Sequence, residues 1–399
     1  MHSLAVSAPR AAFALLLGAA GCASAHADTA SGPLLDVRYR LEQVDQGGFA
    51  HDAYASTVRT RLGYRFAADR GWSALVSMQD NRVVGNDLYD STRNGRTSYP
   101  VVSDPADTEL DQAYVEYHGW QPLDLRAGRQ VIKLDNDRFV GNVGFRQLEQ
   151  TFDAVRATWT LSPAWRVDYA YLTRVNRVFG AHHPDPLHAR QNLDTHLLNV
   201  SWKQAAGTLV GYAYLIGNQS LPASSHRDLG LRWLGHAAHG QGWALDYTLE
   251  AARQHAWKRG TLHGNRDYLH AELALGMRSW RWTLGQERLQ GDGSSALQTP
   301  LATLHAFNGW ADRFLVTPAD GLVDSYAGLG WKAHALSLSA TAHHFAATHT
   351  STHYGDELDL SAGMAIDRHF STSLALADYR ADHYATDTRI VWFTVEYKL

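Results

Sequence analysis

The chain has 399 residues, of which 45% are hydrophobic and only 19% charged, and its formal net charge at pH 7 is -4. This acidic balance argues against nucleic acid as the main partner, because such binding depends on basic patches. Beyond the N-terminal leader no apolar run reaches the roughly 18 residues that a membrane-spanning helix needs, which excludes a helical membrane transporter.

The first residues are typical of an export signal. Arg10 precedes an apolar run over residues 11–20, and Ala25-His26-Ala27 offers a small-residue cleavage site. We therefore predict a signal peptide over residues 1–27 and a single domain over residues 28–399. The one cysteine, Cys22, lies in the leader, where it is either a small apolar residue or a site of lipid attachment. A mature chain without cysteine has no disulfide to stabilise it.

After the leader, the sequence consists of segments of about ten residues in which polar and apolar side chains alternate. In the first segment, apolar residues from Leu35 to Leu41 alternate with charged residues from Asp36 to Glu42. The predicted strands span residues 34–45, 55–67, 71–83, 108–119, 123–133, 150–161, 164–177, 193–204, 207–217, 226–235, 242–255, 266–276, 279–290, 323–333, 335–346, 356–367, 370–380 and 387–398. Such alternation alone fits either a two-sheet sandwich or a membrane barrel.

The connections between these segments favour the barrel. Short ones, such as 67–71, 120–122 and 162–164, take turns with long ones, such as 84–108 and 291–322. Short periplasmic turns and long extracellular loops give this pattern in outer-membrane barrels, whereas a soluble sandwich has no reason for it. The strand count of about eighteen is even, as in single-chain bacterial barrels, so both termini are expected on the periplasmic side.

Tryptophan placement gives a second indication of a membrane barrel, because these residues fall near the ends of the predicted strands. They are Trp72, Trp120, Trp159, Trp165, Trp202, Trp233, Trp243, Trp280, Trp282 and Trp331. Aromatic girdles mark the lipid interfaces of a barrel, although tryptophan is also common in the core of a sandwich.

Two longer stretches carry a family resemblance. Residues 110–157 contain LDQAYVEY, GRQ, LDNDRFVG and FRQLEQTFDAVRA, and residues 301–326 read LATLHAFNGWADRFLVTPADGLVDSY. Both resemble the alginate-export family of outer-membrane barrels. The resemblance implies an all-β barrel of eighteen strands in the bacterial outer membrane and a channel for an acidic polysaccharide. The exporter of that family has a long periplasmic loop that plugs its channel, whereas the longest short-side connection here spans residues 235–242, which argues against dedicated polymer secretion.

The predicted function is an outer-membrane porin that passes an anionic solute, such as the acidic polysaccharide alginate. A barrel of this size encloses an aqueous lumen, and guanidinium groups in series attract carboxylates without trapping them at one site. The arginines expected to face the lumen are Arg38, Arg40, Arg59, Arg61, Arg65, Arg126, Arg156, Arg174, Arg232 and Arg281. The alternative is that they pair with carboxylates of the same parity, namely Asp36, Glu42, Glu116, Asp168, Asp246, Glu250, Glu272 and Glu287.

Two charged loops are candidates for a constriction. Their residues are Lys133, Asp135, Asp137, Arg138, Arg146, Glu149 and Asp153 in the first, and Trp310, Asp312 and Arg313 in the second. Either they fold inward and narrow the pore, or they form a self-paired ion network that stabilises an exposed loop. The sequence leaves both alternatives open.

A polysaccharide-degrading enzyme of the outer membrane or periplasm is the alternative function. Asp135 with Asp137, or Glu149 with Asp153, would supply the two carboxylates of a glycosidase. No GxSxG nucleophile motif is present, and pairs such as His343-His344 lack the spacing of a metal site, so we predict no enzyme, metal or cofactor. The expected partners are outer-membrane lipid, the transported anionic solute or polysaccharide and components of periplasmic secretion, with no nucleic acid.

Overall fold

The computed structural model describes residues 31–239 and 242–399, so the predicted signal peptide and Cys22 lie outside the described residues. Its strands are β1 (Gly32–Gln46), β2 (Ala53–Ala67), β3 (Trp72–Val83), β4 (Asp107–Trp120), β5 (Leu123–Gln130), β6 (Thr151–Thr160), β7 (Trp165–Asn176), β8 (Arg190–Gln204), β9 (Gly207–Ile216), β10 (His226–His239), β11 (Trp243–Ala256), β12 (Asn265–Met277), β13 (Trp280–Gln290), β14 (Gly321–Ala333), β15 (Leu336–Ala346), β16 (His353–Ala365), β17 (Phe370–Ala381) and β18 (Thr388–Lys398).

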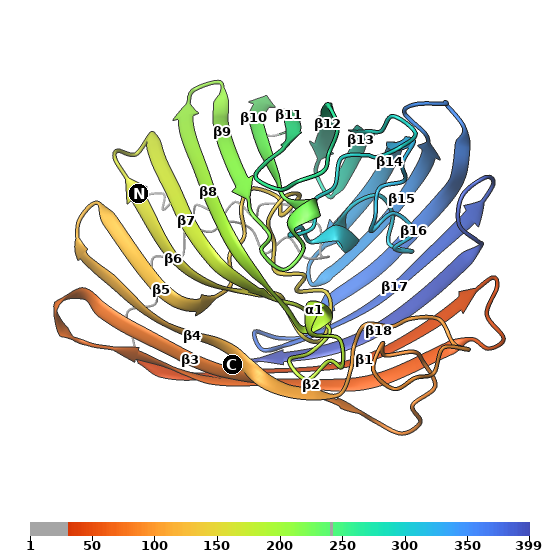
Figure 1. Cartoon of the computed structure of the whole chain (residues 1–399), viewed down its shortest axis with the longest axis horizontal. Helices are drawn as coiled ribbons and strands as arrows, with labels where there is room; N and C mark the ends of the chain where they lie inside the picture. The colour runs from red at the N-terminus through yellow and green to blue at the C-terminus, as the bar shows by residue number, and fades with distance from the viewer. Residues whose placement is uncertain (1–30, 240–241) are drawn as a thin grey trace, which may run out of the picture.

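These strands form one closed antiparallel sheet. Each strand pairs with its neighbours in sequence, and β1 pairs with β18 from Asp36 opposite Lys398 to Gln46 opposite Thr388. Closure removes the exposed edges that would otherwise promote aggregation. The predicted all-β barrel of eighteen strands is confirmed, and Figure 1 shows the strands arranged around an interior that loop segments enter.

The two faces of the sheet differ as the alternation predicts. On β10 the side chain of Leu231 is 59% exposed on the outer surface, whereas its neighbour Arg232 is buried inside. On β13 the outward Leu284 is 65% exposed and Glu287 is buried. An apolar outer surface is stable only where lipid covers it, because a soluble protein would bury these leucines.

The exposed tryptophans form a belt at the end of the barrel that carries the short turns. Trp72 begins β3, Trp120 ends β4, Trp159 lies near the end of β6 and Trp243 begins β11, and all four are at least 43% exposed. An aromatic belt of this kind is typical of the interface between lipid hydrocarbon and headgroups. The prediction of an outward girdle is confirmed, and the alternative of a tryptophan core is wrong for these residues.

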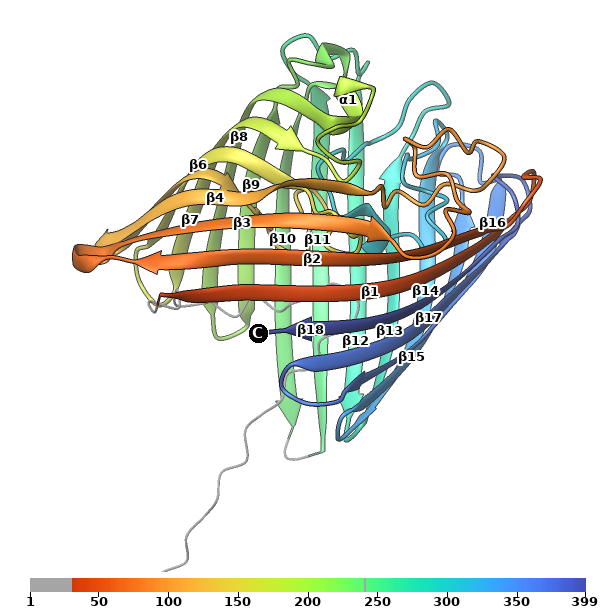
Figure 2. The same ribbon diagram turned by 90° about the horizontal axis from the view of Figure 1, so that it is seen from below.

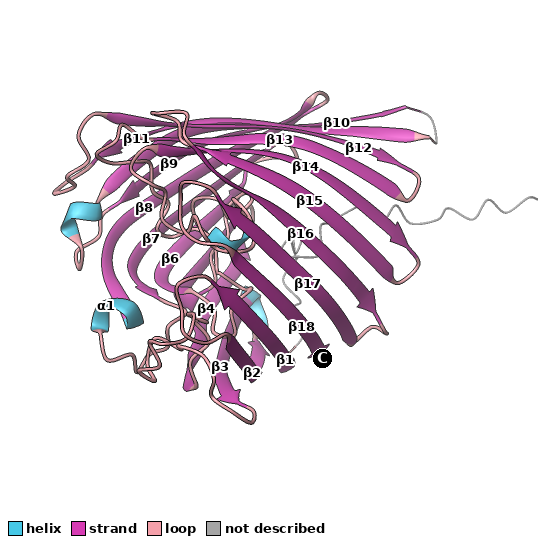
Figure 3. Ribbon diagram, turned by 90° about the vertical axis from the view of Figure 1, so that its right-hand side faces the viewer, coloured by secondary structure: helices cyan, strands magenta, loops and turns pink. Residues whose placement is uncertain are grey.

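The long connections lie at the opposite end from the short turns (Figures 2 and 3). They carry the short helix α1 (Pro186–Ala189) and two short 3-10 helices, η2 (Pro222–Ser224) and η3 (Leu304–Ala306). A third 3-10 helix, η1 (Asp69–Gly71), lies in one of the short turns. Within the described residues no helix is long and apolar enough to cross a bilayer. Two of the long connections, residues 131–150 and 291–320, fold back into the barrel and position the candidate site.

Candidate functional site

The 131–150 loop, which joins β5 to β6, and the 291–320 loop, which joins β13 to β14, pair with each other inside the barrel. Val140 and Leu301 form a parallel β-bridge, and the backbone N–H of Gly141 donates to the carbonyl of Leu301 at 2.9 Å. The N–H of Thr303 donates to the carbonyl of Asp137 at 3.0 Å. These bonds join the two loops into one body that projects into the lumen, so the inward-folding alternative is the one that the structure shows.

Arg138 fixes this body to the inner wall on the β13 side. Its Nε donates to Oε1 of Glu287 on β13 at 2.6 Å, and its Nη1 donates to Thr299 at 3.0 Å. Its guanidinium also lies 4.8 Å from the centre of the Phe307 ring. The side chain is only 2% exposed, so nearly all of its charge is balanced by these groups. A buried pair of this kind is costly to break, because removal of one partner leaves the other charge uncompensated.

Arg146 fixes the same body to the opposite side of the lumen. Its Nη1 lies 3.2 Å from Oε1 of Glu42 on β1, and its Nη2 donates to Oδ2 of Asp312 at 2.9 Å. The carboxylate of Asp104, from the 84–106 loop between β3 and β4, lies 4.0 Å away. Burial lowers the pKa of Arg146, but the three carboxylates outweigh it and raise the pKa above its ordinary value, so the arginine stays charged.

Two arginines of β1 hold the turn before Arg146. Arg38 donates to the carbonyls of Gly144 and Phe145 at 3.1 and 2.8 Å, and Arg40 donates to that of Phe145 at 2.6 Å. The guanidinium of Arg40 also lies 4.2 Å from the centre of the Phe145 ring. Val143 has a φ of 51°, a strained conformation for a β-branched residue that costs about 1–3 kcal/mol. The wall therefore stabilises a loop conformation that this segment would not adopt alone.

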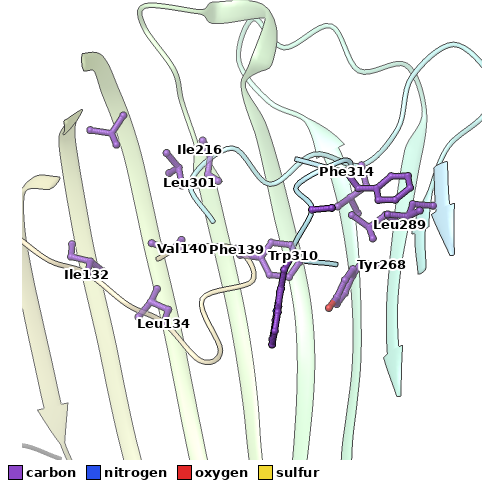
Figure 4. Close-up of a cluster of buried hydrophobic side chains, with 14 of the residues drawn as sticks. Ile132, Leu134, Phe139, Val140, Ile216, Tyr268, Leu289, Leu301, Trp310 and Phe314 are labelled. Atoms are coloured by element: carbon purple, nitrogen blue, oxygen red, sulfur yellow. The ribbon is translucent and has the colours of Figure 1, made fainter. Parts of the chain in front are cut away.

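Apolar side chains pack beneath the ion pairs. Figure 4 shows Ile132, Leu134, Phe139 and Val140 of the first loop near Leu301 and Trp310 of the second. The ring of Phe139 lies 5.3 Å from those of Tyr212 and Tyr268, which face inward from β9 and β12. This contact area is the principal apolar core of the molecule, and it couples the constriction to the barrel wall.

Most acidic residues of the first loop form hydrogen bonds or ion pairs with neighbouring side chains. Asp135 accepts hydrogen bonds from Asn199 at 2.8 Å and Tyr214 at 3.2 Å, and Asp137 pairs with Lys133 at 2.9 Å. Burial raises the pKa of Asp135 and of Asp137 above the ordinary aspartate value. Glu149 pairs with Arg61 on β2 at 3.1 Å. These contacts fit a structural network better than a pair of catalytic carboxylates.

Of the three candidates of the second loop, Asp312 contacts Arg146, whereas Trp310 and Arg313 have other partners. Trp310 is buried, and its backbone N–H donates to Asp359 on β16 at 3.3 Å. Asp312 accepts from the ring of His305 at 2.8 Å, and Arg313 donates to the carbonyl of Ala311 at 2.9 Å. Burial favours a higher pKa for Asp312, but His305 and Arg146 outweigh it and hold the pKa below the ordinary value. Trp310 is therefore mostly packed within the loop, and its remaining surface lines the cavity between the loops and the wall.

Most of the predicted lumen arginines face inward and are paired with acidic neighbours, so the pairing alternative is confirmed for them. Arg126 pairs with Glu116, Arg156 with Asp168, Arg232 with Glu250 and Arg281 with Asp246, and each pair is 2.6–2.9 Å apart. Arg59 contacts both Asp36 and Glu396. Arg40 and Arg65 form no ion pair with any described residue.

Two predicted residues point elsewhere. Leu172 and Val175 are buried on the inner side of β7, and a register shift between Leu172 and Arg174 turns Arg174 outward. Arg174 pairs there with Asp153 at 3.3 Å, and Arg129 pairs with the same carboxylate at 2.8 Å. Arg174 is therefore not a lumen residue, and Asp153 is not part of the constriction. Since Glu149 faces the lumen, the Glu149/Asp153 carboxylate pair of the enzyme alternative is wrong.

A cavity of about 720 Å³ lies between the loop body and the wall from β10 to β16. Lys133, Asp135 and Phe307 line it from the loops, and Asp324, Tyr326 and His343 are among the wall residues. Of these wall residues, Asp324 and Tyr326 were not predicted as site residues, and His343 was considered only as part of a metal-binding pair and rejected. Inward parity on β14 and β15 was the available signal, because it places Asp324, Tyr326 and His343 on the same face as the other lumen residues.

Comparison with known proteins agrees with this architecture. A family model described as alginate export matches residues 34–290, which includes the first resembling stretch and ends before the second. Solved barrels are similar across nearly their whole length: Acinetobacter baumannii OccAB4 (TM-score 0.73, 13% identity), Pseudomonas aeruginosa OccK9 (0.74, 13%) and P. aeruginosa OpdL (0.71, 15%). Each alignment covers 92% of this chain and 98% of the other. No curated protein sequence matches the chain.

Proposed function

The chain belongs to the alginate-export family of bacterial outer-membrane β-barrels. We propose that it is a channel for anionic solutes, and that the solutes are acidic saccharides such as alginate fragments. The proposal includes removal of residues 1–27 and a single barrel domain over residues 28–399. It assigns no catalytic step to the protein.

The observation that carries the proposal is a row of inward arginines on the adjacent strands β1 and β2. Arg38 and Arg59 lie directly opposite each other in the register, and Arg40, Arg61 and Arg65 share their face. Like charges in register repel each other. Among the described residues, only Asp36, Glu396 and Glu149 form ion pairs with this row. The row therefore has more cations than bound carboxylates, and it runs along the wall towards the constriction.

The size of the interior supports a small solute. The cavity of about 720 Å³ lies within the roughly 300–1,000 Å³ range of sites that hold small molecules. The ion pairs of Arg138 and Arg146 keep the loop body across the lumen, so a solute passes beside it. Carboxylates of uronate units are matched by the two parallel donors of each guanidinium.

The enzyme alternative has weaker support. Only Asp135 and Asp137 remain as a candidate pair, and both are engaged by other side chains. Hydrolysis or elimination also needs a free acid and base aimed at one bond, which these contacts do not favour.

Uptake into liposomes tests the proposal. Vesicles that contain the folded barrel should swell faster in sodium glucuronate than in glucose at equal osmolarity, because the arginine row favours the anion. The barrel must also be shown to be folded and conducting. Equal or slower swelling in glucuronate would then contradict the preference for anionic solutes but not the channel function.

A further inference from the structure

A group of histidine and aspartate side chains lies on the outer face of β15 and β16, near the extracellular rim. His344 and Asp356 are paired in the register, and His344 Nδ1 lies 2.8 Å from Asp356 Oδ1. His353 Nε2 lies 3.4 Å from the same oxygen. One potential ligand atom from each of these three residues lies within 4.8 Å of the others.

The chain brings His353 into place through an irregularity in the strand pair. The register shifts between Phe345 and Ala346, so that Phe345 is opposite Gly355 while Ala346 is opposite His353. The rings of His344 and His353 then lie face to face with centroids 4.5 Å apart. The two histidines are nine positions apart in the sequence, a spacing outside the short metal motifs, so the sequence alone indicates no metal site here.

The orientation of His353 is fixed by a second carboxylate. Asp382, in the connection between β17 and β18, lies 2.9 Å from His353 Nδ1. Nδ1 of His353 therefore faces Asp382, and Nε2 faces Asp356 at 3.4 Å. Nε2 is shielded from solvent and finds no hydrogen-bond partner among the described residues.

We propose that His344, His353 and Asp356 form a binding site for a divalent transition metal ion, and that the preferred ion is Zn²⁺. Two imidazoles and one carboxylate are a common three-ligand set for zinc, with a fourth position left for water or an external ligand. A carboxylate on the second ring nitrogen, here Asp382, is the usual support of a metal-binding histidine. The side chains of His344 and Asp356 are 59% and 58% exposed, so the site is open at the surface.

Metal titration of the detergent-solubilised, chelator-treated full barrel tests the proposal. The expected result is one Zn²⁺ bound per chain by calorimetry, and a visible absorption band of bound Co²⁺ when that ion replaces zinc. His353→Ala should abolish both signals. Asp382→Asn, which keeps the size of the side chain, should weaken Zn²⁺ binding about 10- to 100-fold.

The matched control is His369→Ala. His369 lies in a short turn at the other end of the barrel, where its ring contacts only the carbonyl of Lys398 among hydrogen-bond partners, and its loss should leave Zn²⁺ binding unchanged. Heat-modifiable gel mobility establishes that each variant is a folded barrel. The proposal is overturned if the wild-type barrel binds no stoichiometric Zn²⁺, or if His353→Ala and Asp382→Asn bind it as the control does.

Discussion

The guanidinium of Arg146 and the carboxylate of Asp312 lie 2.9 Å apart, although 166 positions separate them in the sequence. Their contact joins the 131–150 loop to the 291–320 loop beside Glu42 of β1. The two loops therefore form one body held from both sides of the lumen. If this body is the constriction, as we propose, its contacts predict how the channel responds to substitution and to pH.

Replacement of Arg138 by methionine should weaken the constriction strongly. The change leaves Glu287 buried without its cation, which costs about 3–5 kcal/mol. We expect a lower unfolding temperature and a larger, noisier single-channel conductance. Arg389→Met is the control, because the ion pair of Arg389 with Asp378 is exposed and its loss should have little effect on either measurement. Equal behaviour of the two variants would show that the Arg138 contact does not hold the loops.

A double-mutant cycle on Arg146 and Asp312 should reveal coupling between the loops. Because the two side chains touch, the effect of Arg146→Gln with Asp312→Asn should differ from the sum of the single effects by about 0.5–3 kcal/mol. Urea unfolding of the barrel in detergent gives the free energies. Strict additivity would mean that the Arg146–Asp312 ion pair does not couple the two loops.

Neutralisation of Arg61 and Arg65 should reduce anion preference. Both face the lumen on β2, Arg61 is 16% exposed and Arg65 has no ion pair among the described residues. The Arg61→Gln/Arg65→Gln variant should shift the reversal potential in a salt gradient towards cations. Arg59→Gln should instead impair folding, because Arg59 is fully buried against Asp36 and Glu396. An unchanged reversal potential in the double variant would show that these arginines do not select the solute.

Acid should weaken the Asp312 contacts only below about pH 4. The pKa of Asp312 is lowered in the folded state, so its contribution to stability is complete above the ordinary value of about 3.9 and is lost as the pH falls through the lowered value. Conductance should thus be constant from neutral pH to about pH 5 and become larger and noisier under stronger acid. Asp312→Asn should show the larger conductance already at neutral pH. A wild-type transition near pH 6 would contradict this assignment.

The barrel could be predicted from the sequence because its two faces meet different solvents. Lipid outside and water inside impose a two-residue period on every strand, and Leu231 beside Arg232 is a typical case. The deviations occur where this period is interrupted. The register shift at Leu172 and Arg174 turned Arg174 outward, and no feature of the local sequence indicates that shift.

The constriction was predictable only in part. The density of charge in residues 133–153 indicated a functional loop, but the partners of that loop lie on distant strands. Arg138 meets Glu287 across 149 positions, and Arg38 meets the carbonyl of Phe145 across 107. Neither short-range spacing nor alternation encodes which loop a strand residue will meet, so these contacts required the three-dimensional structure.

Planar-bilayer recording of the purified, folded barrel tests the central claim most directly. The account predicts discrete conductance steps, a reversal potential that shows higher permeability to chloride than to potassium, and partial block by uronate oligosaccharides. A folded barrel that inserts into the bilayer and gives no conductance in any of these solutions would contradict the channel function.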